Sequence, residues 1–462
     1  REDHRRALCR QQPAQPRGDV EGVRRLRIAR VGRGAGGVAD LAQADPVGAV
    51  DLAQVLATID QGNALFIPGD RTRSSGHAGR ELADDFLDDV FERHEALHLA
   101  IFIHDKQHAT GVHRPYVQCR QHGLAGSGGG NDDRAFGTLG SGVGNVVLSN
   151  GTNLVYNRNV DTVVNNAISG NGNVSATITG NLDVAKTINL STSGNTVNLT
   201  ASGNVSQSAG SISATNLYLT ATNGSIGTST NRINTSVSNL AMTSSGNQFA
   251  TQANALSLAA RTTGTGNIDV KTTNGTLTIT SVNGINGVTA TGSAGNITLE
   301  GNTTSGRGMS INQVITSTNG DVNLTGTTST TSDYSAGIYS TRAVSGKNIT
   351  MVANATAATG NVLGYYGAGG TFNASQQLSL TGNSVNASGL YTYTGSYTSV
   401  TGMTLTSTSV NGSGIGIDNN VTISNTSSGG ITMTGTANAI YDAIGLRGVA
   451  ITNAGGDVVL NA

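Results

Sequence analysis

The sequence predicts an all-β fold, a parallel β-helix or solenoid, for residues 137–462 of this 462-residue chain. Three observations point to it: short runs with an apolar residue at every second position, corner pairs such as Asn-Gly between the runs, and runs that hold mostly single aliphatic side chains. Residues 1–136 differ so strongly in composition that they are treated as a separate segment.

The break between the two segments lies near Phe136. All eight histidines, all five prolines, both cysteines and 17 of the 23 arginines precede it. The residues after it are rich in Ser, Thr, Asn and Gly, and the glycine-rich stretch GSGGGNDD at 126–133 connects the two parts. We therefore expect 1–136 to be an Arg/His/Asp-rich segment with little structure, and 137–462 to be the repeat region.

The runs of the repeat region alternate Ile, Leu, Val or Met with Thr, Ser or Asn. Alternation with a period of two buries one face of a strand and leaves the other in water, and Thr, Val and Ile suit a pleated surface. Clear examples are TINLST from Thr187, TVNLTA from Thr196, NLYLTA from Asn216, NIDVKT from Asn267, NITLEG from Asn296 and QLSLTG from Gln377.

The corner pairs, of which Asn223-Gly224, Asn274-Gly275 and Asn319-Gly320 are the clearest, tolerate the positive φ of a tight turn. Hairpins would fit these corners too, but they would need a large apolar core. A solenoid with coils of about 20 residues needs only a narrow core. About fifteen coils stacked at about 4.8 Å would give a length of roughly 70 Å, with rows of Asn and Thr satisfying each other along the axis.

A family resemblance follows from the passage between Asn216 and Glu300. It contains the step GSIGTS at 224–229, TSVSNLAMTSSGN at 235–247, and recurring GNI-x-V/L and NG-x-L-x-I strands. These elements resemble the repeat region of filamentous haemagglutinin-like adhesins exported by two-partner secretion. The resemblance implies a right-handed parallel β-helix, secretion through an outer-membrane transporter, and adhesion to host or neighbouring cells. The family's amino-terminal secretion domain is not recognisable in this sequence.

The expected function is therefore that of an adhesin fragment, secreted or held at the outer membrane of a bacterial cell. Its partners would be a protein or glycan on a host or neighbouring cell, and the two-partner secretion transporter. Low charge and the absence of cysteine after residue 136 suit export through a pore, with folding coil by coil. A net charge of −1 gives no electrostatic basis for binding nucleic acid. Two alternatives stay open, a carbohydrate-active β-helix enzyme and a purely structural stalk.

The enzyme alternative requires carboxylates that meet on one face. The acids of the repeat region are Asp161, Asp183, Asp269, Glu300, Asp321, Asp333, Asp418, Asp442 and Asp457. They are widely spaced and no histidine accompanies them, although Asp269, Lys271 and Arg261 are candidates to share a face. We predict that the protein is not an enzyme and assign no catalytic, cofactor-binding or metal-binding residue.

Tyrosines gather in a less regular zone at 330–400. Exposed tyrosines offer flat contact area with a polar tip and would favour an adhesin. The favoured interpretation is plainer, namely that Tyr391 and Tyr393, two residues apart, share one strand face. The set comprises Tyr334, Tyr339, Tyr365, Tyr366, Tyr391, Tyr393 and Tyr397.

The amino-terminal segment contains a match to H-E-x-x-H at His94–His98. On a helix His94 and His98 would share a face and hold zinc with Glu95 as base, and His104 stands where metzincin proteases have a third ligand. Ile101, however, replaces the glycine that lets that chain turn. The motif is therefore not assigned as a metal site.

Two further patterns lie near the start of the chain. The first is a G-x-G-x-x-G match at 32–37, which resembles a dinucleotide-binding turn, and the second is ten arginines within the first 33 residues. Translation of a wrong frame in GC-rich DNA would produce this composition, so we interpret 1–136 as a misread or fused stretch. Detection of the tryptic peptide 81–93 in the native organism would contradict that interpretation.

Overall fold

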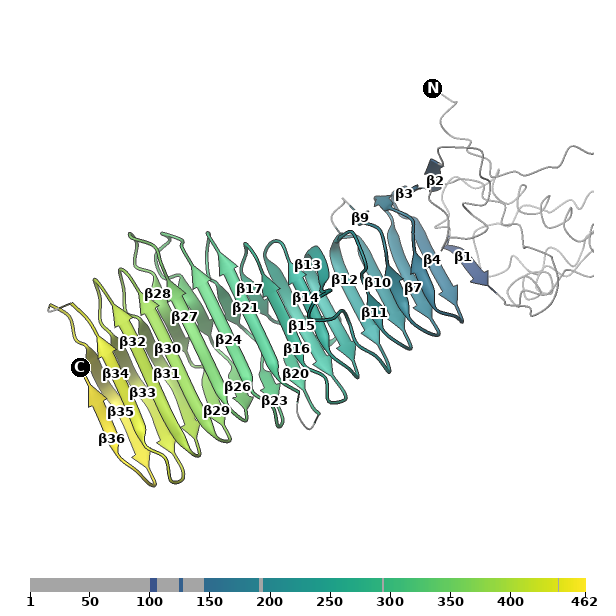
Figure 1. Cartoon of the computed structure of the whole chain (residues 1–462). Helices are drawn as coiled ribbons and strands as arrows, with labels where there is room; N and C mark the ends of the chain where they lie inside the picture. Colours follow the sequence, from purple (N-terminus) through teal and green to yellow (C-terminus); the bar gives the residue numbers. More distant parts are fainter. Residues whose placement is uncertain (1–99, 106–123, 128–144, 191–193, 293–294, 439) are drawn as a thin grey trace, which may run out of the picture. The chain divides into compact units, whose positions relative to one another are not determined.

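The computed structural model describes residues 100–105, 124–127, 145–190, 194–292, 295–438 and 440–462. All of them belong to one compact unit, residues 98–111 and 123–462, and the second unit, 1–97 and 112–122, lies outside the described residues. The regular elements are β-strands that pair in parallel from coil to coil (Figure 1). The predicted all-β parallel β-solenoid is confirmed for the described part of the repeat region.

Four stacks of strands form the walls of the coils. The first contains β1 (Ala100–Asp105), β4 (Asn153–Arg158), β7 (Asn173–Ile178), β10 (Thr196–Ala201), the second halves of β12 (Ile212–Ala221) and β13 (Ile233–Ser244), β15 (Leu256–Thr262), β17 (Leu277–Ile279), β22 (Met309–Ile311), β25 (Ala336–Ser340), β28 (Leu363–Ala368) and the first halves of β31 (Leu390–Ser399), β33 (Ile415–Asn425) and β35 (Ile444–Asn453). We call it stack 1.

Stack 2 forms the second wall of the coils. It contains β5 (Thr162–Val164), β8 (Leu182–Val184), β11 (Val205–Ser206), β14 (Gln248–Gln252), β16 (Ile268–Thr272), β21 (Ile297–Thr303), β24 (Val322–Thr328), β27 (Ile349–Ala355), β30 (Gln377–Ser384), β32 (Gly402–Ser409), β34 (Ile431–Thr436) and β36 (Val458–Asn461). A bridge through Ile226 continues the stack between β11 and β14.

The third wall is formed by one stack of strands in the early coils and by another stack in the later coils. Stack 3 contains β3 (Asn145–Leu148), β6 (Ile168–Gly170), β9 (Ile188–Leu190) and the first halves of β12 and β13, and β2 (Leu124–Ser127) pairs antiparallel with β3. Stack 4 contains β20 (Val288–Ala290), β23 (Ile315–Ser317), β26 (Ala343–Gly346), β29 (Thr371–Ala374) and the second halves of β31, β33 and β35. The coil at 247–266, where the change occurs, has only the strands β14 and β15, and the second half of β15 pairs with β20. The coils on either side of it have three walls.

One Asn-Gly corner makes a hairpin. Strands β18 (Ser281–Val282) and β19 (Ile285–Asn286) pair antiparallel across Asn283 and Gly284, whose φ values are 49° and 76°. Positive φ at both central residues is the requirement of a tight hairpin turn. Val282 packs with Ala241 and Ala259, so this hairpin covers part of the outer surface of stack 1.

The interior is one continuous column of buried aliphatic side chains. In stack 1, for example, Leu154, Val174 and Val197 follow one another in register, each no more than 2% exposed. Because every coil adds only a few such residues, burial comes from stacking rather than from a wide core. This agrees with the alternation seen in the sequence.

A row of side chains at one corner, which we call the asparagine ladder, joins the coils. In nine successive steps a side-chain oxygen accepts the backbone N–H of the equivalent residue one coil later, at 2.7 to 3.3 Å. Its members are Asp161, Asn181, Asn204, Ser225, Asn247, Asn267, Asn296, Asp321, Asn348 and Gln377. The predicted rows of polar side chains along the axis are therefore confirmed.

The spacing of the asparagine ladder along the sequence gives the number of residues in each coil. Successive members are 20 to 23 residues apart up to Asn267, and 25 to 29 apart from there to Gln377. The solenoid consequently has about 12 turns, and the expected fifteen coils are wrong because the later coils are longer than about 20 residues.

Glycine precedes many ladder residues for a steric reason. A Cβ on Gly203 would approach the Asn181 Oδ1 to 2.5 Å, and a Cβ on Gly266 would overlap the carbonyl group of Gly246. The recurring Gly-Asn pair of the sequence is therefore a corner in which the first residue must be small and the second must reach the next coil.

A second glycine feature narrows the interior at the later coils. Gly326 and Gly382 of stack 2 face Gly337 of β25 and Gly389, which directly precedes β31, and a Cβ on Gly337 would lie 2.5 Å from the backbone nitrogen of Asn354. We call this contact of the two walls the glycine seam. It is a close approach of backbones that no larger residue permits.

Candidate functional site

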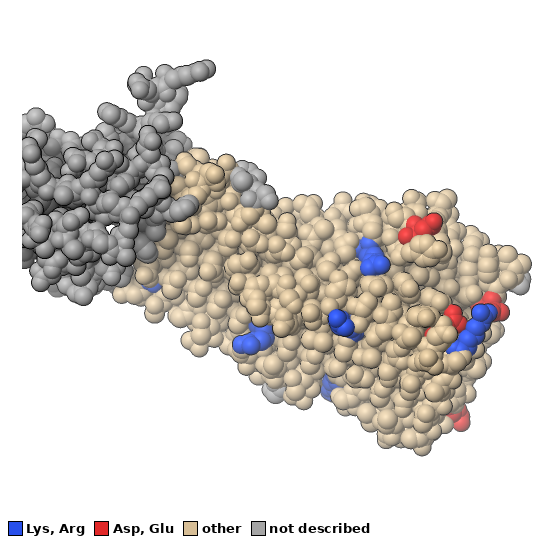
Figure 2. Space-filling view, turned by 180° about the vertical axis from the view of Figure 1, so that it is seen from behind, with Lys and Arg blue, Asp and Glu red and all other residues tan. Residues whose placement is uncertain are grey.

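Charged side chains are few on the solenoid, as Figure 2 shows for one face. One of them, Arg232, donates four hydrogen bonds to neighbouring coils. Its Nη2 donates to Asp269 Oδ1 and to the carbonyl oxygen of Asp269, both at 2.8 Å, and to the carbonyl oxygen of Ala250 at 2.9 Å. Its Nε donates to Thr251 Oγ1 at 3.0 Å, and the guanidinium lies 5.7 Å from the centre of the Phe249 ring. Arg232 thereby fastens three coils together.

The candidate cluster of Asp269, Lys271 and Arg261 does not share a face. Asp269 and Lys271 point outward from β16 in stack 2, whereas Arg261 points outward from β15 in stack 1. Asp269 is occupied by Arg232 instead. Sequence reasoning missed this pair because its members are 37 residues apart.

Other carboxylates accept hydrogen bonds from neighbouring coils. Asp183 accepts from Ser206 and Ser208, and Asp333 accepts the backbone N–H of Asn361 at 2.6 Å. Asp161 accepts two bonds from Asn181, which lower the pKa of the Asp161 carboxyl. No group of three or more His, Cys, Asp or Glu side chains that could hold a metal ion occurs among the described residues.

Three tyrosines form an outward row on stack 1, which we call the tyrosine ladder. Tyr339, Tyr366 and Tyr391 stand in register on β25, β28 and β31. The ring centres of Tyr339 and Tyr366 are 5.4 Å apart with a 57° tilt, and those of Tyr366 and Tyr391 are 5.8 Å apart with a 36° tilt. All three are half-buried, so each residue keeps part of its surface in solvent.

A positively charged side chain lies at one end of the tyrosine ladder and a negatively charged one at the other. The Arg307 guanidinium carbon lies 3.6 Å from the centre of the Tyr339 ring, within the range of a cation–π interaction. At the other end the Tyr391 hydroxyl donates to Asp418 Oδ2 at 3.2 Å. Burial and then the Asp418 carboxylate raise the pKa of Tyr391. The row is thus a fixed aromatic surface with a positive and a negative end.

Two further tyrosines of the zone at 330–400 are more exposed. Tyr334 is 69% exposed and Tyr393 is 45% exposed. Tyr393 follows Tyr391 by two residues and alternates with buried Leu390 and Thr392, so the prediction that Tyr391 and Tyr393 share a strand face is confirmed. The register shifts directly after Tyr393, and such a bulge changes the direction of the side chains around it.

The remaining tyrosines of the zone lie inside the solenoid. Tyr365 packs edge-on against Phe372 with ring centres 5.9 Å apart, and Tyr397 stacks on Phe372 with ring centres 5.6 Å apart. Their hydroxyls meet at 3.3 Å, and Thr392 Oγ1 lies 2.6 Å from the Tyr397 hydroxyl. Burial raises the pKa of both phenols. The seven tyrosines therefore divide into an inner pair and an outer group.

Small residues make room for the inner rings. The stack 1 column that holds Ile311 in one coil and Ile417 in another holds Ser340, Gly367 and Thr392 between them. A Cβ on Gly367 would lie 2.8 Å from each of the two tyrosine hydroxyls. The aromatic volume is thus compensated in the neighbouring positions, as close packing requires.

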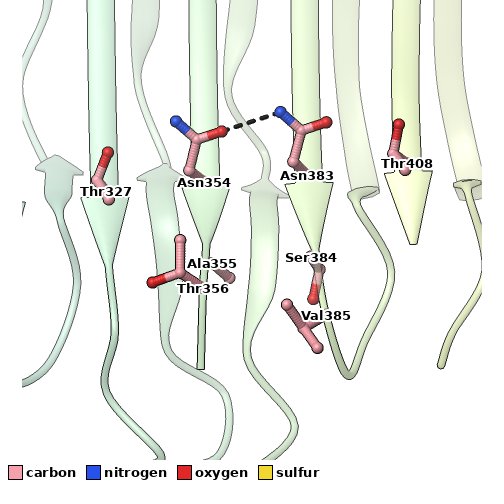
Figure 3. A pocket seen from close by; sticks show the side chains of 8 residues that line it. All are labelled: Thr327, Asn354, Ala355, Thr356, Asn383, Ser384, Val385 and Thr408. Atoms are coloured by element: carbon pink, nitrogen blue, oxygen red, sulfur yellow. Dashed lines mark hydrogen bonds between the residues drawn. The ribbon is translucent and has the colours of Figure 1, made fainter. Parts of the chain in front are cut away.

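An open groove of about 340 Å³ lies at the edge of stack 2 (Figure 3). Asn383 Nδ2 donates to Asn354 Oδ1 at 2.9 Å in its centre. The groove is uncharged, and it offers amide and hydroxyl groups beside methyl groups. Its lining comprises Thr327, Asn354, Ala355, Thr356, Asn383, Ser384, Val385 and Thr408. No signal in the sequence marked it.

The motifs of the amino-terminal segment fall almost entirely outside the described residues. His94, His98 and the glycines at 32–37 lie there, as do the arginines of the first 33 residues. His104 lies on β1, a strand that pairs in parallel with β4.

The comparisons with known proteins give no relative. No family model matches the chain, and no curated protein or solved structure is significantly similar to it. Among the described residues no helix is long and apolar enough to cross a membrane. What can be inferred about function therefore rests on the solenoid and its surfaces.

Proposed function

We propose that the chain is part of a bacterial adhesin, secreted or held at the cell surface, in which the solenoid presents binding surfaces to host or neighbouring cells. The observation that carries this proposal is the tyrosine ladder with its charged ends. Tyrosine and arginine are the residues most often found at the energetic centres of interfaces. Rings already ordered by stacking lose little conformational entropy when a partner binds.

The partner is a protein or glycan of another cell surface. Tyr393 lies two residues after Tyr391 on the same strand face and extends the aromatic surface beyond the tyrosine ladder, and it is 45% exposed. A single small surface of this kind binds weakly, so attachment of a cell depends on many copies acting together. Export by an outer-membrane two-partner secretion transporter fits a chain whose coils fold by pairing with the preceding coil.

Binding of the labelled full chain to bacterial and epithelial cells, and to arrays of glycans and matrix proteins, tests the proposal. Tyr366→Ser removes the central ring, and we expect it to weaken binding about 30-fold, as for a residue contributing about 2 kcal/mol. Tyr366→Phe keeps the stacking and should bind nearly as wild type. Tyr441→Ser is the matched control, because Tyr441 is 44% exposed and stands outside the ladder.

Three outcomes would refute the proposal. They are no binding of the folded chain to any surface, equal binding of Tyr366→Ser and wild type, and equal loss in Tyr366→Ser and Tyr441→Ser. Folding of each variant is checked by its circular dichroism spectrum and thermal midpoint. A folded chain without any binding would instead support the stalk alternative.

A further inference from the structure

The outward surface of stack 2 between β24 and β34 differs from the other sides of the same coils. Five strands, β24, β27, β30, β32 and β34, each point three residues outward between the asparagine ladder and the end of the strand. Threonine takes ten of these fifteen positions, asparagine three, and serine and valine one each. No charged side chain stands among them. We call this surface the threonine face.

The pairing register turns the threonine face into a lattice. Thr404, Thr406 and Thr408 of β32 lie in register with Thr432, Thr434 and Thr436 of β34. The middle column continues back through β30 and β27 to β24 without a register shift. Neighbours across coils are therefore about 4.8 Å apart, and neighbours along a strand are about 6.7 Å apart. The third column lines the open groove at Thr327, Asn354, Asn383 and Thr408, so the first two columns form the lattice beside the groove.

The hydroxyls of this lattice are available to a ligand. Within the described part of the chain, Thr434 accepts a hydrogen bond from Asn461 at 3.3 Å, and the other nine threonine hydroxyls of the face have no protein partner. Most of these side chains are half-buried by one another. Threonine is restricted at χ1, so the hydroxyls and methyls hold fixed positions.

Threonine is not simply the usual outward residue of these coils. The outward positions of stack 1 carry the tyrosine ladder, Gly416 and Asp418. Those of stack 4 hold threonine repeatedly, as at Thr371, Thr398 and Thr422, but mixed with alanine, serine and asparagine. What sets the threonine face apart is its continuity, because each of the three outward positions of both β32 and β34 is a threonine and the two strands are in register.

We infer that the threonine face binds ice. A regular, uncharged lattice of hydroxyls and methyls suits a ligand that repeats in two dimensions, because equivalent positions then contribute in the same way. The water oxygens on a prism face of ice repeat at nearly the same two spacings. Methyl groups order the water next to them, and the free hydroxyls complete its hydrogen bonding. This inference does not rest on the proposed adhesion to cells.

A crystalline polysaccharide is the competing ligand, since it too repeats in two dimensions. Sugar rings pack on the faces of aromatic side chains, and the threonine face has none. The neutral groove at its edge is lined by amides, hydroxyls and methyls and likewise lacks an aromatic ring. Ice is therefore the ligand that these side chains fit better.

The test is whether the folded full chain binds to growing ice. Thermal hysteresis and the shape of single ice crystals are recorded, together with the fraction of labelled protein taken into a slowly grown ice hemisphere. The double variant Thr406→Lys with Thr434→Lys places two charges at the centre of the lattice. Its matched control, Thr398→Lys with Thr422→Lys, places the same charges outward on stack 4 of the same coils.

We expect the wild type and the control to shape ice and enter the hemisphere, and the lattice variant to behave as a buffer blank. Crystals unaffected by folded wild-type protein would overturn the inference. So would equal activity of the two double variants, or binding to suspended cellulose or chitin with no effect on ice. Circular dichroism of each variant confirms that the solenoid is intact.

Discussion

Removing one member of the asparagine ladder should weaken the whole solenoid. Asn267 stands in the middle of it, where its Oδ1 accepts the N–H of Asn296 at 2.8 Å and its own N–H donates to Asn247 Oδ1 at 2.8 Å. Asn267→Ala leaves the N–H of Asn296, an exposed residue, to be solvated by water. We expect a loss of about 1 kcal/mol in the free energy of unfolding, which is the net contribution of a typical hydrogen bond.

The size of the effect on melting follows from the length of the solenoid. An unfolding entropy of about 2 cal/mol/K per residue over the repeat region gives a midpoint about 1–2 °C lower. Asn267→Asp should keep most of the stability at neutral pH, because Asp161 and Asp321 already occupy ladder positions as acceptors. Asn323→Ala is the matched control, since Asn323 is exposed and points outward from β24.

Thermal melts of the full chain followed by circular dichroism provide the assay. The reasoning is refuted if Asn267→Ala melts with the wild type, or if Asn323→Ala falls by the same amount. A fall in Asn267→Asp as large as that in Asn267→Ala would also contradict it, because the acceptor oxygen is retained.

Three further predictions concern single side chains. Gly326→Ala should lower the free energy of unfolding by about 1–3 kcal/mol because its Cβ overlaps the facing backbone at the glycine seam, whereas Gly445→Ala should be tolerated because its Cβ would meet its nearest atom at 3.5 Å. Urea unfolding midpoints of the two variants provide the measurement, and equal midpoints would contradict the close contact at the seam. The pKa of Asp161 is lowered in the folded chain, so its contribution to stability is present above the unfolded value near 3.8 and is lost as pH falls through the folded value; melts of Asp161→Asn from pH 6 to 2 should show a shallower decline than wild type, and parallel curves would exclude the effect. The raised pKa of Tyr397 makes the neutral phenol part of the fold, so stability should be full below about pH 10 and fall as pH rises above it; Tyr397→Phe should lower the neutral-pH midpoint and flatten that alkaline fall, and an unchanged slope in melts from pH 8 to 12 would contradict this.

The alternation of apolar residues was enough to predict the wall strands and the side that each buries. Leu154, Val174 and Val197 are inward because an aliphatic at every second position has only one side that avoids water. The stacking of equivalent positions likewise predicted rows of Asn and Thr along the axis, although the bonds of the asparagine ladder run from backbone N–H groups to side-chain oxygens. A local sequence pattern is enough to predict these features, because every coil buries its apolar side chains and stacks its polar ones in the same way.

Other features depend on contacts that no local pattern carries. Tyr365 and Tyr366 are adjacent and chemically identical, yet one is inside the solenoid and the other is outside. Their neighbours Gly364 and Gly367 have no side chains, so no alternation of apolar and polar residues shows which of the two tyrosines faces inward. The glycine seam and the pair of Arg232 and Asp269 join residues of different walls or coils. Their existence depends on the length of each coil, which varies between 20 and 29 residues.

The most direct test of the account is a distance between two coils. Spin labels at Asn323→Cys and Thr432→Cys, with Cys9 and Cys119 replaced by serine, mark two ends of one outward column on stack 2. Four coil steps separate them, so their backbones should lie about 19 Å apart with a narrow distribution. A broad distribution, or a mean far from this value, would contradict the parallel in-register solenoid on which both proposed surfaces depend.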